Sequence, residues 1–455
     1  MNPFVKLKEY AKGIFEKTKE GVKSMTEKKM WFEEEIGKPR YKERINRVEK
    51  VDSYLAREHK VLNRPDFDFK GKSYETAKVV LNTLKSILKF HSGYMTSNPV
   101  SLTGDKELVS VLNKIYKIGN YNKRDMQIAK ELLKYGDAFE YVYLDENENI
   151  QSKVINNRDS YPLYDGNGNY NCFVESWKDE DTSKMHYIVY HEDVVEIYED
   201  NQLVDTKMNL TGLPIWYSSM EKTVGTKFGD PFIFDLTMVQ DTIENLLSKL
   251  DDAVTTLSLN PLGVVSGQRV DGAIPEDVVG VILNLEEGAS FDYATVSMDK
   301  ESIKLELDYL IQQFYAIANV PASVLGNSNI ANVSETSLGL LYQQTDNFCK
   351  EYITVMVEGM HKRLEYIRAL MEIKGIKIED EVFDSINISF NVNRPVDNKS
   401  DMENMKMQYE CGAMSRQTII DKSPYTTDTA LEIQRIEEEN GQKVEKEIEI
   451  DEKVD

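Results

Sequence analysis

The chain has 455 residues, a formal net charge of −23 and hydrophobic residues at 41% of its positions. This length is enough for about three domains with substantial cores. So negative a charge excludes a protein whose main role is to grip nucleic acid, because lysine and arginine contacts to phosphates supply most non-specific affinity. It still permits a protein past which DNA slides without sticking.

The cysteines and the apolar runs narrow the class of protein further. Cys172, Cys349 and Cys411 are scattered and show no paired spacing, so we expect free thiols in a reducing compartment. No apolar run approaches the length of a transmembrane span, and the N-terminus lacks the apolar core of a signal peptide. We therefore expect neither a membrane partner nor a secretory route.

The first fifty residues are rich in lysine and glutamate. Their apolar residues recur at helical intervals: Phe4, Leu7, Tyr10, Ile14 and Phe15. This spacing predicts an amphipathic helix. Either the helix is solvated, or it is an arm that docks on a partner.

The next part of the chain alternates helical and strand patterns. The spacing of apolar residues predicts helices over 74–94, 105–118 and 123–135, a strand over 138–143, and a β-meander over 154–216. Within the meander we expect three strands, at 172–177, 186–191 and 194–198. The many tyrosines of this region suit a half-buried sheet.

A long helix is predicted over 231–259. Asp230 and Pro231 form a suitable start, with the aspartate as the cap, and Asn260-Pro261 ends the pattern. One apolar stripe follows the helix: Ile243, Leu247, Leu250, Val254 and Leu257. Acidic residues fall between these positions: Asp241, Glu244, Asp251 and Asp252. A stripe on so long a helix needs a partner.

That partner comes after a short β-rich excursion. Apolar runs at 262–265, 278–285 and 291–296 are bounded by glycine, proline and aspartate, which is typical of short strands. A second helix then repeats the apolar spacing up to Pro321: Ile303, Leu307, Leu310, Ile311, Phe314 and Ile317. Two helices that leave and re-enter one body, with a β module between them, predict a protruding stalk of the kind that assemblies use.

The remainder of the chain is mostly helical in pattern. Residues 321–333 are polar and uncharged and predict a flexible loop. A helix is expected over 335–373, a strand over 386–392, and helices over 399–410 and 428–440. The last fifteen residues are rich in glutamate and lysine, and we expect a frayed tail.

The chain lacks a recognisable catalytic pattern. Gly71-Lys72-Ser73 has Asp66 where a phosphate loop requires glycine. His186 and His191 are five residues apart, on opposite faces of the expected strand, so they do not jointly bind a metal. The carboxylate pairs Asp251-Asp252 and Glu286-Glu287 diverge from one another and suit solvated charges better than catalysis. We expect no enzyme activity, no metal and no cofactor.

Several short motifs, taken in order, resemble phage portal proteins, specifically the portal family of tailed phages of Bacillus-like hosts. They run from Gly93-Tyr94 and Asn98-Pro99-Val100, through Tyr135-Gly136-Asp137-Ala138-Phe139 and Gly212-Leu213-Pro214-Ile215, to Gly229-Asp230-Pro231 with Asp241, Ile243 and Ser248, and finally Val320-Pro321 with Ser334 and Leu338. Each motif alone is weak, and the order together with the stalk is specific.

This resemblance implies an α+β portal fold with an α/β wing, a two-helix stem, a small β-rich clip, a long wing helix and a helical C-terminal crown. The implied boundaries are 1–228 for the N-terminal arm and wing, 229–260 for the first stem helix, 261–297 for the clip and 298–320 for the second stem helix. They continue with 321–334 for the tunnel loop, 335–395 for the long helix and wing strand, and 396–455 for the crown and acidic tail.

The same resemblance assigns roles to residues. Stem packing falls to the two apolar stripes: Ile243, Leu247, Leu250, Val254, Leu257, Ile303, Leu307, Leu310 and Phe314. The acidic residues of the channel or stem are Asp241, Glu244, Asp251, Asp252, Glu301 and Asp308. The tunnel loop would present Asn327, Ser328, Asn329 and Asn332 to DNA, and the clip would dock partners through Val278, Val281, Leu283, Glu286 and Glu287. A solvated outer face explains the acidic residues equally well.

The implied function is a ring, usually of twelve copies, at one capsid vertex, through which viral DNA is packaged and ejected. Expected partners are the terminase large subunit, a head-completion or adaptor protein, the major capsid and scaffolding proteins, and transient non-specific double-stranded DNA. The expected location is the virion, with assembly in the host cytoplasm. The alternatives are a ring-forming head or tail adaptor that conducts no DNA, and a hydrolase or nuclease.

Overall fold

The computed structural model describes residues 30–69, 72–255, 262–267, 286–294, 300–321, 335–393, 398–423, 425–426, 429 and 432–439. The fold is α+β, as predicted. The chain divides into two compact units, Met1–Val324 with Gln344–Asn393 and Leu325–Gln343 with Arg394–Asp455, and each is described by itself. In the described part of the chain, no helix is both long and apolar enough to cross a membrane.

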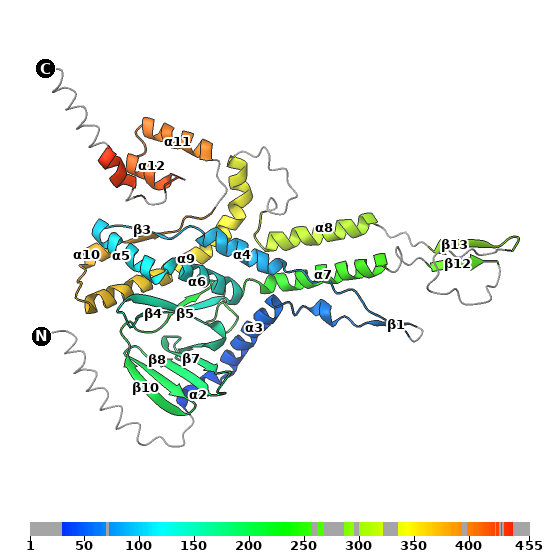
Figure 1. The fold of residues 1–455 in the computed structure, drawn as a ribbon, viewed down its shortest axis with the longest axis horizontal. Helices are drawn as coiled ribbons and strands as arrows, with labels where there is room; N and C mark the ends of the chain where they lie inside the picture. Colours follow the sequence, from blue (N-terminus) through cyan, green and yellow to red (C-terminus); the bar gives the residue numbers. More distant parts are fainter. Residues whose placement is uncertain are drawn as a thin grey trace, which may run out of the picture. The chain divides into compact units, whose positions relative to one another are not determined.

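Two antiparallel sheets form the centre of the first unit (Figure 1). The larger sheet is a meander in the order β10-β9-β8-β7-β6, built from β6 (Ser160–Tyr164), β7 (Tyr170–Lys178), β8 (Met185–Tyr190), β9 (Val194–Glu199) and β10 (Gln202–Met208). The smaller sheet has the order β11-β4-β5, from β11 (Ile215–Ser218), β4 (Asp137–Leu144) and β5 (Ile150–Ile155). The meander predicted over 154–216 therefore contributes strands to both sheets.

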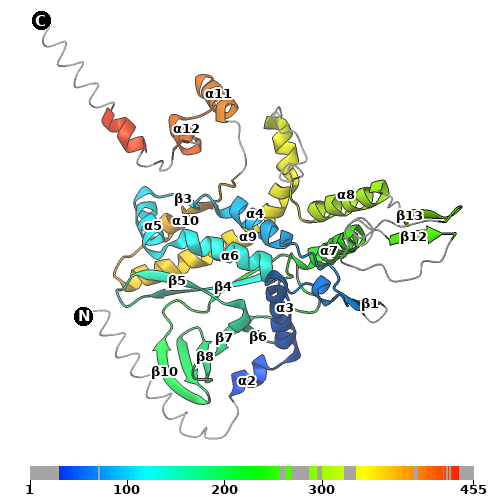
Figure 2. The same cartoon turned by 45° about the vertical axis from the view of Figure 1, so that its right-hand side comes forward.

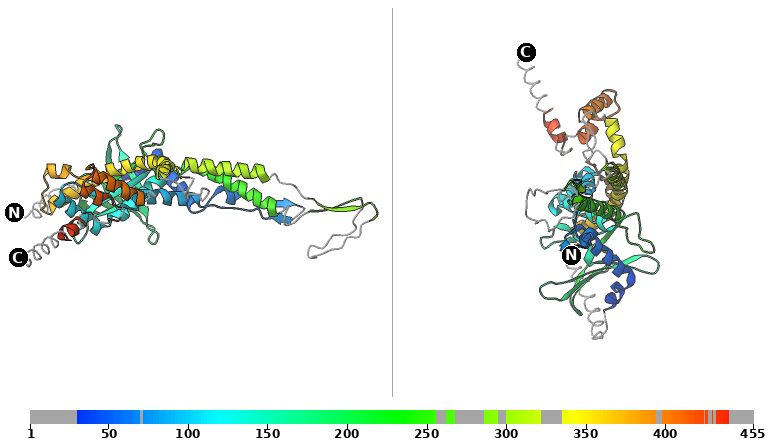
Figure 3. Two further views of the ribbon diagram at one scale, coloured as in Figure 1. Left: turned by 90° about the horizontal axis from the view of Figure 1, so that it is seen from above. Right: turned by 90° about the vertical axis from the view of Figure 1, so that its right-hand side faces the viewer.

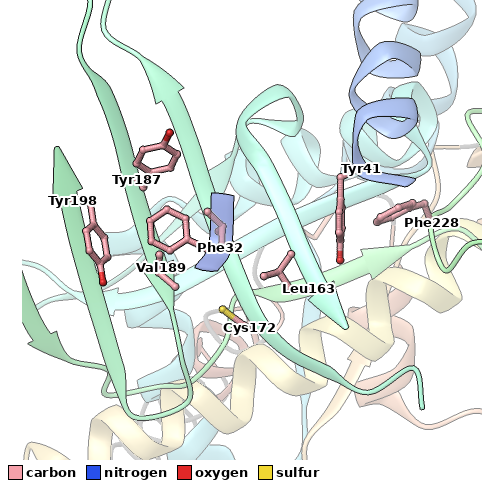
Figure 4. Packing of buried hydrophobic residues seen from close by; sticks show 9 residues of the cluster. Phe32, Tyr41, Leu163, Cys172, Tyr187, Val189, Tyr198 and Phe228 are labelled. Atoms are coloured by element: carbon pink, nitrogen blue, oxygen red, sulfur yellow. The ribbon is translucent and has the colours of Figure 1, made fainter. Parts of the chain in front are cut away.

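Two helices near the N-terminus pack against the larger sheet: α2 (Trp31–Ile36) and α3 (Pro39–Leu55). Phe32 inserts between Tyr187 and Tyr198, with ring centroids 5.1 Å from each (Figure 4). Tyr41 of α3 is fully buried and packs on Phe228, 5.8 Å away. The expectation of a solvated helix is therefore wrong for residues 31–50, because their apolar and aromatic side chains complete the core of the sheet. The residues on which that expectation rested, Phe4, Leu7, Tyr10, Ile14 and Phe15, lie outside the described part of the chain.

Three helices contact the smaller sheet: α5 (Lys106–Gly119), α6 (Tyr121–Tyr135) and α9 (Glu335–Ile373). Helix α4 (Thr83–Thr96) packs on α6. Helix α6 lies against β4 and β5 (Figure 2). Helix α9 has the predicted bounds, whereas α4 begins nine residues later than predicted because residues 77–81 are extended and bound to another helix, as described below.

Short elements complete the first unit. Strands β1 (Phe67–Phe69) and β2 (Lys72–Tyr74) pair, as do β3 (Ser101–Thr103) and β14 (Asn387–Ser389). The short helices are η1 (Lys60–Asn63), η2 (Asn157–Asp159) and α10 (Asp380–Asp384). Strand β14 lies within the strand predicted over 386–392, and its pairing with β3 connects the end of α9 back to the region after α4.

A buried charged network joins α9 to the sheet and to α6. Arg363 donates to Glu140 (Nε to Oε2, 2.9 Å) and to Asp125 (Nη1 to Oδ1, 2.7 Å), and Tyr217 donates to the same Glu140 oxygen at 2.6 Å. All four side chains are buried. Burial raises the pKa of Asp125 even though Arg363 opposes the shift. Such a network stabilises only when its members stay paired.

The predicted stalk helices are α7 (Phe234–Val254) and α8 (Lys300–Ile317), which lie side by side (Figures 1 and 3). Between them in the chain, β12 (Leu262–Ser266) pairs antiparallel with β13 (Ser290–Ala294). The predicted cap is wrong: Asp230 instead accepts a bond from the Thr223 hydroxyl at 3.0 Å, and α7 starts three residues beyond Pro231 with Ile233 as its cap.

The second unit contains the described helices α11 (Asn398–Glu410) and α12 (Arg416–Lys422). Residues 432–439 are also helical. Helix α11 matches the helix predicted over 399–410 to within one residue, and α12 was not predicted. The helix expected over 428–440 lies partly outside the described residues.

Two glycines of α9 provide a matched test of packing. A Cβ at Gly359 would lie 2.1 Å from Cε1 of the buried Tyr217, whereas a Cβ at Gly339 would meet nothing within 4 Å. We predict that Gly359→Ala lowers the free energy of unfolding by about 2 kcal/mol or more, because Tyr217 cannot move without leaving Glu140. Gly339→Ala should raise it, by up to about 1 kcal/mol, from helix propensity. Differential scanning fluorimetry of both variants measures the difference, and equal effects would contradict the packing described.

Candidate functional site

The entry to the α7–α8 pair meets the start of β4 through backbone atoms. Gly136, at a φ of +78°, faces Gly229, and a Cβ on Gly229 would lie 2.0 Å from the Gly136 carbonyl oxygen. Next to this contact, the buried Asp137 accepts bonds from the Gly229 N–H (3.0 Å) and from Trp216 Nε1 (2.8 Å). Arg44 of α3 lies 3.6 Å from the same carboxylate. The junction therefore joins α3, β4, β11 and the start of α7.

One face of α7 carries a polar side chain at each of four successive turns: Gln240, Glu244, Ser248 and Asp252. We call this set the ladder, and residues 77–81, which it binds, the strap. The ladder accepts three backbone N–H groups, Ala77 on Asp252 (2.7 Å), Val79 on Ser248 (2.9 Å) and Leu81 on Glu244 (2.9 Å). Gln240 completes it by donating to the Leu81 carbonyl at 3.0 Å.

The ladder can bind the strap because one step of the ladder along the helix is nearly as long as two residues of an extended chain. Four residues of an α-helix rise about 6.0 Å, and two residues of an extended chain rise about 6.6 Å. Alternate N–H groups of the strap therefore meet successive turns of α7, as they would meet the edge of a sheet. The pairing runs antiparallel, from Ala77 at Asp252 to Leu81 at Glu244.

His59 completes the set of polar contacts to the Glu244 carboxylate. Its Nδ1 lies 2.7 and 2.9 Å from the two Glu244 oxygens, and its Nε2 lies 3.0 Å from the Tyr54 carbonyl oxygen. Both ring nitrogens of His59 are thus engaged with oxygen atoms. The Tyr54 ring stacks on His59, 4.1 Å between centroids. This closed arrangement is buried and leaves Glu244 no exposed surface.

Two further acidic residues of α7 bind the same N-terminal region. Asp241 accepts from the Tyr54 hydroxyl (3.0 Å) and pairs with Lys60 (2.8 Å), and Asp252 pairs with Arg64 at 2.7 Å. Burial, followed by the Asp241 carboxylate, raises the pKa of Tyr54. The prediction that Glu244 lines a channel is wrong, because its carboxylate is buried. Asp241 and Asp252 are likewise engaged within the chain, and Asp251 stays exposed.

The apolar stripes of α7 and α8 face each other within one copy of the chain. Ile243 and Phe314, assigned above to stem packing, are buried within a single copy of the chain. The other described stripe residues are half-buried: Leu247, Leu250, Ile303, Leu307 and Leu310. Val254 is exposed at the end of α7. Side chains of α7 and α8 thus stabilise the helix pair within a single copy of the chain.

The C-terminal end of α8 is capped by side chains from two other helices. His91 of α4 donates to the Ala318 carbonyl (2.7 Å), and Gln344 and Thr345 of α9 donate to the carbonyls of Ala316 (3.0 Å) and Asn319 (2.7 Å). These are carbonyls that a helix end leaves without an intrahelical partner. Burial lowers the pKa of His91 to about 4, so its ring is neutral and its Nε2 carries the donated proton.

One further face of α7 and one of α8 are exposed to solvent. On α8 it carries Leu305, which is 72% exposed, and Tyr309, which is 61% exposed, together with the exposed Glu301 and Asp308. On α7 it carries Met238, which is 73% exposed, followed by Thr242, Asn245 and Lys249. Apolar side chains this exposed at helical spacing indicate a surface that another protein covers. Carboxylates share that surface on α8, and the middle of the exposed α7 face has none.

Some predicted site residues lie outside the described part of the chain. These are Leu257 of the first stripe, Val278, Val281 and Leu283 of the β module, and Asn327, Ser328, Asn329 and Asn332 of the loop. Glu286 and Glu287 are described and exposed, just before β13. Within the described residues, no group of three or more histidine, cysteine or acidic side chains could hold a metal ion.

Comparison with protein families matches residues 35–446 to the family described as phage portal protein, SPP1 Gp6-like. The chain belongs to this phage portal family. Portal proteins are structural components of the virion, so this chain is a virion protein and not an enzyme. Two of the motifs that carried the resemblance, around Gly136 and Gly229, meet at the junction described above.

Solved structures with a related arrangement come from gene transfer agent particles. Chains from the neck of an empty particle (TM-score 0.47) and from the neck of a native particle computed with C12 symmetry (TM-score 0.43) each align over 73% of this chain and 87% of their own length, at 10% identity. A chain from the virion of the native particle has a TM-score of 0.42. No curated protein matches the sequence.

The ladder can be tested by comparing two acidic residues of α7. Glu244→Ala removes the partner of His59, the Leu81 N–H and Gln240, and should destabilise the chain by about 3–5 kcal/mol because buried partners are left unpaired. Asp251→Ala, on the exposed surface of the same helix, should stay within about 0.5 kcal/mol of the parent. The unfolding temperature measures both.

A milder variant keeps this test informative if Glu244→Ala does not fold. Ser248→Ala removes one acceptor of the strap, at a cost of about 1–2 kcal/mol. Limited trypsin digestion should then cut faster at Lys78, which lies within the strap. Unchanged cleavage and stability in both variants would show that the strap does not depend on the ladder.

Proposed function

We propose that the chain forms a ring, usually of twelve copies, at one vertex of the capsid, and that viral DNA passes through this ring during packaging and ejection. The observation that carries the proposal is the family match over residues 35–446. In the ring, residues 229–260 and 298–320 form the stem, 261–297 the clip, 321–334 the tunnel loop, and 396–455 the crown. Residues 1–228 form the arm and wing, with the long helix and strand of 335–395.

The exposed surface of the helix pair supports assembly through the stem. Leu305, Tyr309 and Met238 project from two helices that already contact each other within one copy of the chain. A second copy that covers them removes apolar surface from water, at about 25 cal/mol per Å². The ring contact therefore uses the outward faces of α7 and α8, and Ile243 and Phe314 are not part of it.

The charges of the stem support a channel that does not bind DNA tightly. The net charge is −23, and Asp251, Glu301 and Asp308 are the exposed members of the acidic set. Glu301 and Asp308 share the α8 face with Leu305 and Tyr309, so Asp251, and not Glu244, is the exposed carboxylate left to repel phosphates and keep DNA mobile. The uncharged tunnel loop then touches the duplex without forming ion pairs that each step would have to break.

The clip and the outer surface meet other proteins in this proposal. The terminase large subunit docks on the clip during packaging, and a head-completion or adaptor protein replaces it later, with Glu286 and Glu287 at that surface. Major capsid and scaffolding proteins surround the wing, and assembly takes place in the host cytoplasm. A ring-forming adaptor without DNA is the second candidate, and co-assembly with a terminase large subunit distinguishes the two.

Ring assembly provides the first test. Leu305→Asp should leave the protomer folded, because the side chain is 72% exposed, but should prevent rings, because a charge would be buried without a partner. Leu305→Met keeps an apolar side chain of similar volume and should assemble normally. Negative-stain electron microscopy and size-exclusion chromatography measure assembly. Normal rings from Leu305→Asp would exclude this face from the interface.

DNA passage provides the second test. Asn329→Lys adds a cation to the tunnel loop of every copy, and each cation offers a phosphate contact that must break before DNA advances. We predict normal rings but empty or partly filled heads, with a milder defect for Asn329→Asp. Packaged DNA per head is the measurement. Full packaging by both variants would place the loop away from DNA, and failure to form rings would make it an assembly element.

A further inference from the structure

A small hollow of about 120 Å³ lies where α7, α8 and α9 meet the segment before α7. Three aromatic rings form its floor. The ring centroid of Phe348 lies 4.6 Å from that of Phe232 and 5.0 Å from that of Tyr352. A cavity of about 150 Å³ holds a benzene molecule. The hollow is somewhat smaller than that, so it can take one aliphatic side chain or part of an aromatic ring.

Three exposed carboxylates surround this aromatic floor. Glu221, Asp235 and Glu351 all line the hollow. None of the three has a cation within ion-pair distance among the residues that the structure describes, unlike Asp241, Glu244 and Asp252 on the strap face of α7. An apolar floor with an acidic rim selects a ligand that combines an apolar side chain with nearby positive charges.

The chain contains a segment of that chemistry. Residues 1–29 carry eight lysines and four glutamates, a net charge of +4 in a chain whose total is −23. Lysines alternate with large apolar residues in its first half, as in Phe4-Val5-Lys6-Leu7-Lys8 and Tyr10-Ala11-Lys12. Twenty-nine residues reach about 40 Å as a helix and up to about 95 Å when extended.

We propose that residues 1–29 dock in this hollow, with one aromatic or aliphatic side chain on the floor and lysines against Glu221, Asp235 and Glu351. A second hollow, lined by residues that include Ile36, Ile45 and Tyr161, has both Lys42 and Glu49 in its lining and offers the lysines no comparable set of carboxylates. Docking ties the N-terminal arm to the base of the α7–α8 pair. This inference does not depend on the passage of DNA.

Photo-crosslinking in the full-length chain tests the docking. Tyr10→p-benzoylphenylalanine and Phe4→p-benzoylphenylalanine place a benzophenone in the arm. Met220, which lines the hollow and is 55% exposed, offers a reactive thioether to it. Peptide mapping by mass spectrometry should find cross-links to residues 219–221 or 348–355. Mixing isotope-labelled and unlabelled chains shows whether the arm comes from the same copy or from a neighbour.

Charge reversal supplies the matched control. Glu221→Lys combined with Glu351→Lys should lower the cross-link yield about tenfold, because two attractions become repulsions. Glu365→Lys, also exposed on α9 but not part of the hollow, should leave it unchanged. All three positions are exposed, so the variants should keep the parent unfolding temperature. Cross-links at Ile45 or Tyr161, cross-links only to another protein, or a yield unaffected by the double reversal would each overturn the proposal.

Discussion

Four polar side chains on successive turns of α7 bind an extended strap of backbone, and the position of the helix pair depends on this interaction. The match between helical and extended repeats lets one face of a helix take the role of a sheet edge. In this chain, that face of α7 binds the strap of the same copy and is not available to a neighbouring copy. Helix α8 covers a second face of α7. The surface of α7 that a neighbouring copy can contact is therefore narrow, because the strap and α8 already cover the other faces.

The chain is strongly acidic overall, yet its most constrained carboxylates are buried and matched one by one. Glu244 has His59, Asp137 has Arg44, and Glu140 shares Arg363 with Asp125. Where two carboxylates share one guanidinium, burial disfavours the second negative charge, which agrees with the raised pKa of Asp125. The interior thus uses charge to hold elements together, whereas the net charge of −23 makes copies of the chain repel one another.

Sequence periodicity predicted α9 to the residue because its apolar positions repeat without interruption for ten turns. It failed for residues 77–81, where an apolar pattern of helical spacing belongs to an extended strap whose bonding partners lie about 165 residues away. It also failed for Glu244, since periodicity shows that a helix face is polar but not what covers it. The resemblance identified the family correctly. The roles of the loop and of the β module remain predictions, because the loop and the middle of the β module lie outside the described ranges.

The contact between Gly136 and Gly229 has a mechanical consequence. Side-chain contacts can yield by changing rotamer, but two backbones pressed together with no Cβ between them have little such compliance. A twist or axial push on α7 would therefore pass to β4 and to the residues bound at Asp137 with little loss of amplitude. We expect the junction to behave as a stiff coupling. When the helix pair tilts, the sheet and helices around β4 should move with it as a rigid body.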